Sequence, residues 1–168
     1  MNSTQRIKAK IRIMERSDYI ILDELLYHAI YIPEEVSLPS RSIINEPDIF
    51  TYIDDFGDKL GDLGVVAEVN GQVVGGAWTR IIHAYGYIDE NTPELAISIL
   101  PKFRGYGIGT KLMNKLFKLL KENGYKQTSL SVQKDNPAIR LYKRLGYEIV
   151  DEKYGNIGHE DYLMIKYL

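Results

Sequence analysis

Apolar residues recur with two different periods along this chain, and the change between them predicts a mixed α/β fold. The helical period is clearest in 110–122, where six apolar residues form one broad face and four lysines lie opposite. Short runs rich in β-branched and aromatic residues predict strands at 11–14, 94–100, 126–132, 147–150 and 161–168. Strands and helices alternate in the second half of the chain, which indicates a sheet with helices packed against it.

The strongest local signal is a hairpin within residues 63–82. Asn70-Gly71 separates two β-rich runs, and this dipeptide supplies the positive φ angles of a tight turn. We therefore expect two antiparallel strands on either side of it. Trp78 in the second run is most simply a core residue, and the two glycines before it allow a bulge.

Helix signals organise the first third of the chain. Ser17 is a candidate N-cap for a helix over Asp18–Ile30. Residues 33–47 carry turn signals and predict a loop. Pro47 can then open a second short helix, which Gly57 can end.

Length, composition and charge indicate one globular domain over residues 1–168. The chain is 45% hydrophobic and 26% charged, and 168 residues suffice for one sizeable core. A formal net charge of -2 provides no broad positive field for nucleic acid or an anionic membrane. Residues 1–17 lack a signal-peptide core and no later run approaches the length of a membrane span, so we expect a cytoplasmic location.

The absence of cysteine narrows the chemistry. It excludes disulfides, thiolate nucleophiles and cysteine-bound zinc. The histidines, at 28, 83 and 159, are too scattered to indicate a metal site, so no metal is expected. Catalytic chemistry must therefore come from oxygen and nitrogen groups.

Three glycines lie within five positions between a predicted strand and a predicted helix, at 105, 107 and 109. Glycine weakens both kinds of element, so this density indicates that something approaches the backbone closely. A helix start exposes unpaired N–H groups and the positive end of its dipole, which favour a bound anion such as phosphate. Packing alone also explains a lone glycine cluster, and both interpretations stay open at this point.

Two common phosphate motifs fit this cluster poorly. The segment GYGIGTK lacks the spacing of a Walker loop. A dinucleotide-binding fingerprint needs its third glycine where Thr110 stands, and no strand-borne acidic residue follows about 20 residues later.

A third phosphate motif fits well. The segment RGYGIG (104–109), with the apolar strand and Pro101 before it, resembles the Arg/Gln-x-x-Gly-x-Gly/Ala signature of the GNAT superfamily of N-acetyltransferases. The segment NPAIRLYKRLGYEIV (136–150) resembles the second motif of that family, in which an asparagine and a short tyrosine-bearing helix precede Leu-Gly-Tyr and a strand. The two motifs occur in order over roughly residues 94–150.

This resemblance implies a GNAT-like fold, with a central, mixed, mostly antiparallel, twisted sheet of six to seven strands flanked by about four helices. It implies acetyl-CoA as cosubstrate, lying between the strands at 94–100 and 126–132 with its pyrophosphate on the loop amides. The amine then attacks the thioester directly, without an acyl-enzyme, which agrees with the lack of cysteine. C-terminal strands of this fold family often pair across dimers, so a homodimer is left open.

Glu94 is the candidate general base. It begins the strand whose far end becomes the glycine loop, which places its carboxylate near the thioester end of a cofactor lying along that strand. Amines are mostly protonated at neutral pH, so a base is useful, and several GNAT enzymes use a glutamate at the corresponding strand position. A solvated glutamate is the alternative, and Asp89 and Glu90 are weaker substitutes.

Tyr142 is the candidate general acid. It shares one helix face with Ala138, Leu141 and Leu145, a spacing that by itself is more typical of a core tyrosine. The resemblance favours catalysis, because the tyrosine at this position of the family motif donates a proton or a hydrogen bond to the departing sulfur.

Backbone N–H groups of the 94–100 strand are the candidate oxyanion donors, because the family has a bulge there that frees an amide. Ile99 is the first candidate and Leu100 the second, and the two amides of pantetheine can pair with the same segment like an added strand. Asn136 is a candidate N-cap, and the family pattern implies that it also hydrogen-bonds the cofactor. The expected cofactor-binding residues are Ile97, Ile99, Leu100, Arg104, Gly105, Tyr106, Gly107, Ile108, Gly109, Thr110, Asn136 and Tyr142.

The expected acceptor is a primary amine on a small molecule or a peptide, and its identity is left open. Acidic residues in the loops 33–48 and 83–93 favour a cationic amine, although acidic loop residues are usually just solvated. A CoA-binding regulatory module without turnover is the alternative function. A nucleotide-binding domain is a third hypothesis, which the glycine spacing disfavours.

Overall fold

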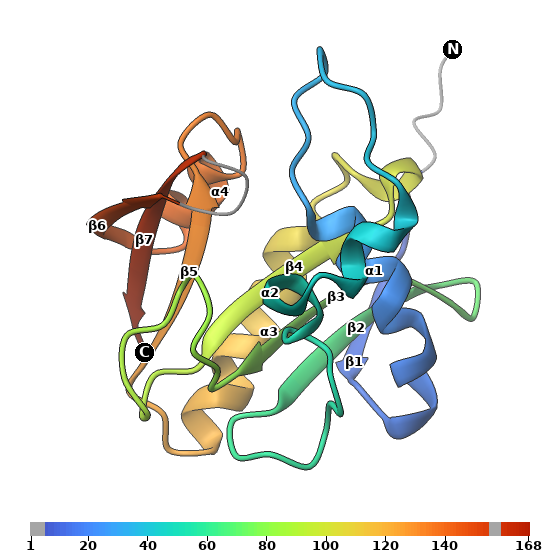
Figure 1. The fold of residues 1–168 in the computed structure, drawn as a ribbon. Coiled ribbons are helices and arrows are strands. Elements are labelled where there is room, and N and C mark those ends of the chain that lie inside the picture. The colour runs from blue at the N-terminus through green and yellow to red at the C-terminus, as the bar shows by residue number, and fades with distance from the viewer. Residues whose placement is uncertain (1–5, 155–158) are drawn as a thin grey trace.

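The computed structural model describes residues 6–154 and 159–168. Seven strands form one sheet in the order β1-β2-β3-β4-β5-β7-β6 (Figure 1). All neighbouring strands are antiparallel except β4 and β5, which run parallel, so the expected mixed and mostly antiparallel sheet is confirmed. The strands are β1 (Lys10–Ile13), β2 (Leu63–Val69), β3 (Gln72–Arg80), β4 (Glu94–Ile99), β5 (Gln127–Gln133), β6 (Glu148–Tyr154) and β7 (Glu160–Tyr167).

Helices cover both faces of this sheet (Figure 1). Each face of the sheet has its own hydrophobic core, and the side chains of β2 alternate between the two. Val65 and Ala67 pack with α3 on one face, and Val66 packs with α1 and Trp78 on the other. No helix within the described residues is long and apolar enough to cross a membrane. The helices are α1 (Leu22–Ala29), α2 (Pro47–Phe50), α3 (Ile108–Glu122) and α4 (Ile139–Arg144), with short 3-10 helices η1 (Arg16–Ile21), η2 (Arg41–Asn45) and η3 (Pro101–Phe103).

The predicted hairpin is confirmed between β2 and β3. Asn70 and Gly71 have φ angles of 51° and 79°, as the tight turn requires. The β2–β3 register shifts beside Gly75, which is the bulge that the glycines were expected to allow. Trp78 is fully buried, as predicted.

The first helix begins differently from the prediction. Residues 16–21 form the 3-10 helix η1, so the α-helix itself covers only Leu22–Ala29. Glu15 rather than Ser17 is the N-cap, because the Glu15 N–H donates to the Asp18 carboxylate at 2.7 Å and Arg12 holds the same carboxylate. The predicted loop after α1 also contains a helical turn, η2.

The helix that Pro47 opens is shorter than expected. It ends after one turn, and Gly57 lies beyond a run of further turns with a φ of 118°. Carbonyl groups that would continue the helix instead accept hydrogen bonds from β3. Arg80 Nη1 donates to the Thr51 carbonyl at 3.0 Å, and Trp78 Nε1 donates to the Tyr52 carbonyl at 3.0 Å.

Strands β4 and β5 are joined at one end and separate toward the other. Among the described residues their one register pair is Glu94 with Ser129, and the Ser129 N–H donates to the Pro93 carbonyl at 3.1 Å. Figure 1 shows the two strands diverging beyond this pair. Residues of both strands line a cavity in the resulting wedge, where the sequence analysis expected the cofactor.

Candidate active site

The glycine turn leads from β4 into α3 with its backbone amides open to a ligand. Gly105 and Gly107 have φ angles of 82° and 78°, in the left-handed region that favours glycine. A Cβ atom at either position would meet no other atom within 4 Å. Gly107 is the N-cap of α3, and no side chain of the described residues caps the helix, so its first-turn N–H groups are left for an anion.

The third glycine has a different environment. Helix α3 begins at Ile108, two residues before the expected start at Thr110, because the left-handed Gly107 already sets the turn into the helix. Gly109 lies in the first turn against β4 and α4. A Cβ atom there would lie 3.4 Å from the side chains of Ile99 and Leu141, which is ordinary van der Waals contact, so the packing leaves room for an alanine at this position.

Arg104 connects the end of β4 to the end of α1. Its Nε donates to the Ile99 carbonyl at 2.9 Å, and its Nη2 donates to the His28 carbonyl at 3.1 Å. The guanidinium therefore holds one wall of the site in place beside the glycine turn.

The backbone of β4 corrects the prediction for Leu100. Its N–H donates to the Val74 carbonyl at 2.8 Å, so it is not free to bind an oxyanion. Hydrogen-bonded pairs alternate along antiparallel strands, so the N–H groups of Ile97 and Ile99 point away from β3, toward the wedge. The β3–β4 register contains no shift, so the expected bulge in β4 is absent, and divergence from β5 exposes these amides instead.

A cavity of about 530 Å³ adjoins the glycine turn. Asn136 lines it, and its Oδ1 accepts a hydrogen bond from the Ala138 N–H at 2.9 Å. Ala138 is the N-cap of α4, so the prediction of Asn136 as the N-cap is wrong, and Asn136 instead stabilises the turn before the helix. The turn residues 105–108 and Thr110 are next to this cavity in the chain but do not line it. The predicted cofactor residues that line it are Ile97, Ile99, Arg104, Gly109, Asn136 and Tyr142.

Glu94 is buried at the closed end of the wedge, with 3% of its surface exposed, so the solvated alternative is wrong. Its Oε1 accepts hydrogen bonds from the Tyr52 hydroxyl and, at 2.8 Å, from the Gly86 N–H. Its Oε2 has no hydrogen-bond partner among the described residues. Burial raises the pKa of Glu94 to about 7, although both hydrogen bonds act against this shift.

The groups that position Glu94 were missed by the sequence analysis. A Cβ atom on Gly86 would lie 2.6 Å from the Glu94 carboxylate, so a glycine is needed there. Burial raises the pKa of Tyr52 well above its usual value, which keeps its hydroxyl protonated as a donor. Tyr52, Gly86 and Glu94 come from separate segments, and no spacing in the sequence links them.

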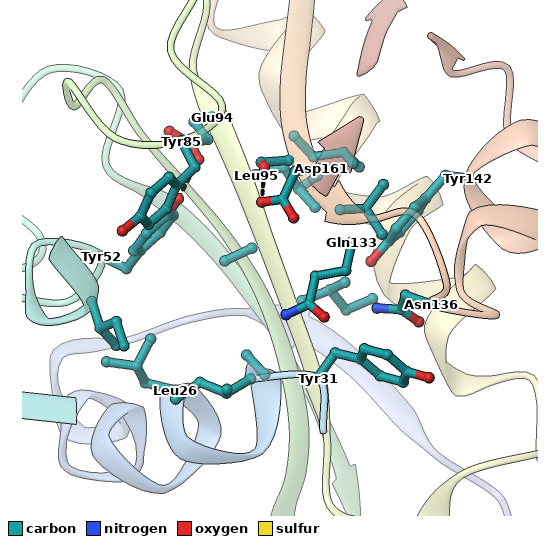
Figure 2. A pocket seen from close by; sticks show the side chains of 18 residues that line it. Leu26, Tyr31, Tyr52, Tyr85, Glu94, Leu95, Gln133, Asn136, Tyr142 and Asp161 are labelled. Atoms are coloured by element: carbon teal, nitrogen blue, oxygen red, sulfur yellow. Dashed lines mark hydrogen bonds between the residues drawn. The ribbon is translucent and has the colours of Figure 1, made fainter. Parts of the chain in front are cut away.

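Tyr142 lies across the wedge from Glu94, on α4. It is 8% exposed and packs edge-on against Tyr147, with ring centroids 5.9 Å apart. Figure 2 shows its hydroxyl directed into the cavity that Glu94 also lines. Burial raises the pKa of Tyr142 to about 12, so the hydroxyl keeps its proton at neutral pH.

The weaker candidates for the base lie elsewhere. Glu90 is exposed, and its Oε1 accepts a hydrogen bond from the Tyr87 hydroxyl at 2.8 Å. The same oxygen lies 2.8 Å from His83 Nε2, which donates to it in the tautomer that carries a proton on Nε2. Asp89 and Glu90 do not line the cavity that Glu94 and Tyr142 share.

A parallel strand pair that opens into a wedge, with a glycine turn of uncapped amides at one end and a buried carboxylate at the other, is the arrangement of an acyl-CoA-dependent N-acyltransferase. The sequence model of the acetyltransferase (GNAT) family matches residues 28–147, and the chain belongs to this family. Both sequence motifs therefore predicted the family correctly.

Individual relatives agree with this assignment. Acetyltransferase ECA0875 of Pectobacterium atrosepticum is 38% identical over 111 residues, which cover 64% of this chain and 71% of that protein. The crystal structure of the ribosomal-protein-S18-alanine N-acetyltransferase of Escherichia coli has a TM-score of 0.68 at 21% identity, covering 95% of this chain and 94% of that one. The structure of yncA from Salmonella typhimurium with its cofactor acetyl-CoA has a TM-score of 0.67 at 23% identity, covering 96% and 94%. The two structures share the fold.

Proposed function

We propose that this protein transfers the acetyl group of acetyl-CoA to a primary amine by direct attack in a ternary complex. In this proposal Glu94 is the general base and Tyr142 is the general acid. Family membership supports the acetyltransferase class and the cosubstrate. The observation that carries the mechanism is the Glu94 carboxylate, which is held at Oε1 and left without a partner among the described residues at Oε2, in a cavity that Tyr142 also lines.

The backbone of the wedge binds the cosubstrate in this proposal. The free N–H groups at the start of α3 hold the pyrophosphate, with Arg104 adding positive charge beside them. The pantetheine arm pairs with the free edge of β4 at Ile97 and Ile99. Support for this path comes from the cavity that runs from the turn to Tyr142.

Catalysis then needs two proton movements and one exchange of bonds. Glu94 Oε2 takes a proton from the amine, directly or through water, and the nitrogen attacks the thioester carbon. The Ile99 N–H stabilises the resulting oxyanion, the carbon–sulfur bond breaks, and an N-acetyl product forms. Tyr142 gives its hydroxyl proton to the departing sulfur, which leaves as the CoA thiol, and solvent then carries the proton held by Glu94 back to the Tyr142 oxygen.

Ligand binding and turnover together test this function. We expect acetyl-CoA and CoA to raise the melting temperature, whereas ATP and NAD do not. We also expect release of free thiol when acetyl-CoA is mixed with some member of a panel of amines. Stabilisation by both CoA forms without thiol release for any amine would instead support a CoA-binding regulatory module. A preference for ATP or NAD would contradict both CoA functions.

A further inference from the structure

Three buried side-chain oxygens that lack a hydrogen-bond partner among the described residues line a single cavity. They are Glu94 Oε2, Gln133 Oε1 and Asp161 Oδ1. All three are hydrogen-bond acceptors, and buried polar groups in folded proteins are almost always paired. The cavity therefore suits a ligand that donates several hydrogen bonds.

The cavity has an acidic lining, and burial raises the pKa of both of its carboxyl groups, Glu94 and Asp161. Within the described part of the chain, its lining includes two carboxylates, Glu94 and Asp161, and no lysine, arginine or histidine. The rings of Tyr31, Tyr52 and Tyr85 also line it, and aromatic faces attract cations. Figure 2 shows Tyr52 and Tyr85 beside Glu94, Asp161 between Glu94 and Gln133, and Tyr31 beyond Gln133 near Asn136.

The basic residues near Asp161, among them His159, form no ion pair with it within the described residues. Lys134 bonds to Glu152 at 2.6 Å and to Glu160 at 2.9 Å, so its charge is already balanced. Lys153 is paired with Asp161 in the β6–β7 register, but it is exposed and forms no ion pair with Asp161 within residues 6–154 and 159–168.

Asp161 and Gln133 lie together at some distance from Glu94. They pair in the β5–β7 register, and Asp161 is 7% exposed. The Ser131 hydroxyl donates to Asp161 Oδ2 at 3.0 Å, which leaves Oδ1 for a ligand. Glu94 pairs with Ser129 and Asp161 pairs with Gln133, four residues farther along β5, so the two residues are offset by about 13 Å along the strand direction. The Asp161 side chain reaches back toward Glu94, to the Ser131 hydroxyl.

We propose that the acceptor is an aliphatic diamine, whose second ammonium group is bound by Asp161 and Gln133 while the reacting amine faces Glu94. This inference rests on the proposed acetyl transfer. It excludes amino carboxylates as good acceptors, because their carboxylate would lie among Glu94 and Asp161. It also makes monoamines poor acceptors, because they leave the oxygens of Asp161 and Gln133 unpaired.

Three acceptors of matched length test the inference with the full chain. They are 1,4-diaminobutane, butylamine and 4-aminobutanoate, each assayed by thiol release at saturating acetyl-CoA. We expect kcat/KM for the diamine to exceed that of the other two by about tenfold or more. Equal values for butylamine, or a higher value for 4-aminobutanoate, would overturn the inference.

Variants locate the second ammonium group. Asp161→Asn is expected to raise KM for the diamine by about tenfold or more, with kcat within about twofold and kcat/KM for butylamine unchanged. Asp151→Asn, which changes an exposed carboxylate on the neighbouring strand β6, is the matched control and should leave both substrates unaffected. If Asp161→Asn fails to fold, Gln133→Met provides the same comparison from the neighbouring strand.

A binding measurement separates this inference from the proposed function. The protein saturated with CoA is titrated with 1,4-diaminobutane in a calorimeter, for the natural chain and for Asp161→Asn. Binding that depends on Asp161 but gives no thiol release would contradict acetyl transfer and support the ligand class. Thiol release with other amines, without binding of the diamine, would support acetyl transfer and contradict the ligand class.

Discussion

The two halves of the wedge between β4 and β5 present different kinds of groups to a ligand. The half next to α3 presents backbone N–H groups of Ile97 and Ile99 and of the start of α3, together with the Arg104 guanidinium. The half next to Glu94 presents side-chain oxygens from β4, β5, β7 and two loops. The first half suits a phosphate that is the same in every cosubstrate molecule, and the second suits a particular acceptor.

This difference predicts different sensitivities to substitution. The backbone half depends on φ angles, so changes at its left-handed glycines should affect cosubstrate binding. The side-chain half depends on the identity of single atoms, so isosteric changes should affect turnover or acceptor choice without affecting CoA. The following predictions test this separation, beginning with the largest expected effect.

Replacing Glu94 with glutamine removes the base but preserves its shape. The substituted side chain keeps an oxygen that can accept hydrogen bonds from Tyr52 and Gly86. We expect Glu94→Gln to lower kcat by about 10² or more, with the affinity for acetyl-CoA unchanged. Thiol release and calorimetry measure the two quantities. Glu90→Gln, in the exposed part of the preceding loop, is the control, and near-normal turnover of Glu94→Gln would remove Glu94 from the mechanism.

Tyr142→Phe deletes one hydroxyl and preserves the ring that packs against Tyr147. We expect kcat to fall by about tenfold to a hundredfold, because the departing sulfur loses its hydrogen bond. The melting temperature should stay unchanged, since the hydroxyl faces the cavity. If Tyr142→Phe lowered the melting temperature but left kcat unchanged, Tyr142 would be a core residue without a catalytic role.

Gly107→Ala and Gly124→Ala form a matched pair at the two ends of α3. Both glycines have a positive φ, 78° and 86°, and neither position has another atom within 4 Å of an added Cβ. Each substitution should therefore cost about 1–2 kcal/mol of unfolding free energy. Only Gly107→Ala should also raise KM for acetyl-CoA, by about tenfold. An equal effect of both variants on KM would contradict phosphate binding at the turn.

The pH dependence gives the smallest expected effect. A base must be deprotonated to act, and burial raises the pKa of Glu94 to about 7. We expect kcat/KM to rise with pH, to reach half of its plateau near pH 7, and to level off above it. The same inflection should be missing in Glu94→Gln. A profile that is flat between about pH 6 and 8 would contradict the assignment of Glu94 as the base.

The same pKa also affects stability. The folded protein holds the Glu94 proton more tightly than the unfolded chain, whose glutamate has a pKa of about 4.5. The contribution of Glu94 to stability is therefore complete below about pH 4.5 and declines as pH rises through about 7. Denaturant titrations at several pH values should show this decline in the natural chain and a smaller one in Glu94→Gln.

Sequence patterns predicted the backbone half of the wedge better than the half that is built from side chains. The glycine turn, the hairpin at Asn70-Gly71 and the helix of Tyr142 are each encoded within a few consecutive residues, so their patterns could be recognised. The prediction for the Pro47 helix failed because distant side chains intervened. The Pro47 helix ends early because Arg80 and Trp78 of β3 take its carbonyl groups.

The sequence by itself determined the family, the glycine turn that we propose binds phosphate and the two residues proposed for catalysis, because these depend on local spacing and on backbone angles that only glycine favours. Only the tertiary structure decided that the Leu100 amide is used in the sheet, that Gly86 and Tyr52 hold Glu94, and that Asp161 lies in the same cavity. Those contacts join segments far apart in the chain. They follow from strand order and register, which local patterns do not encode.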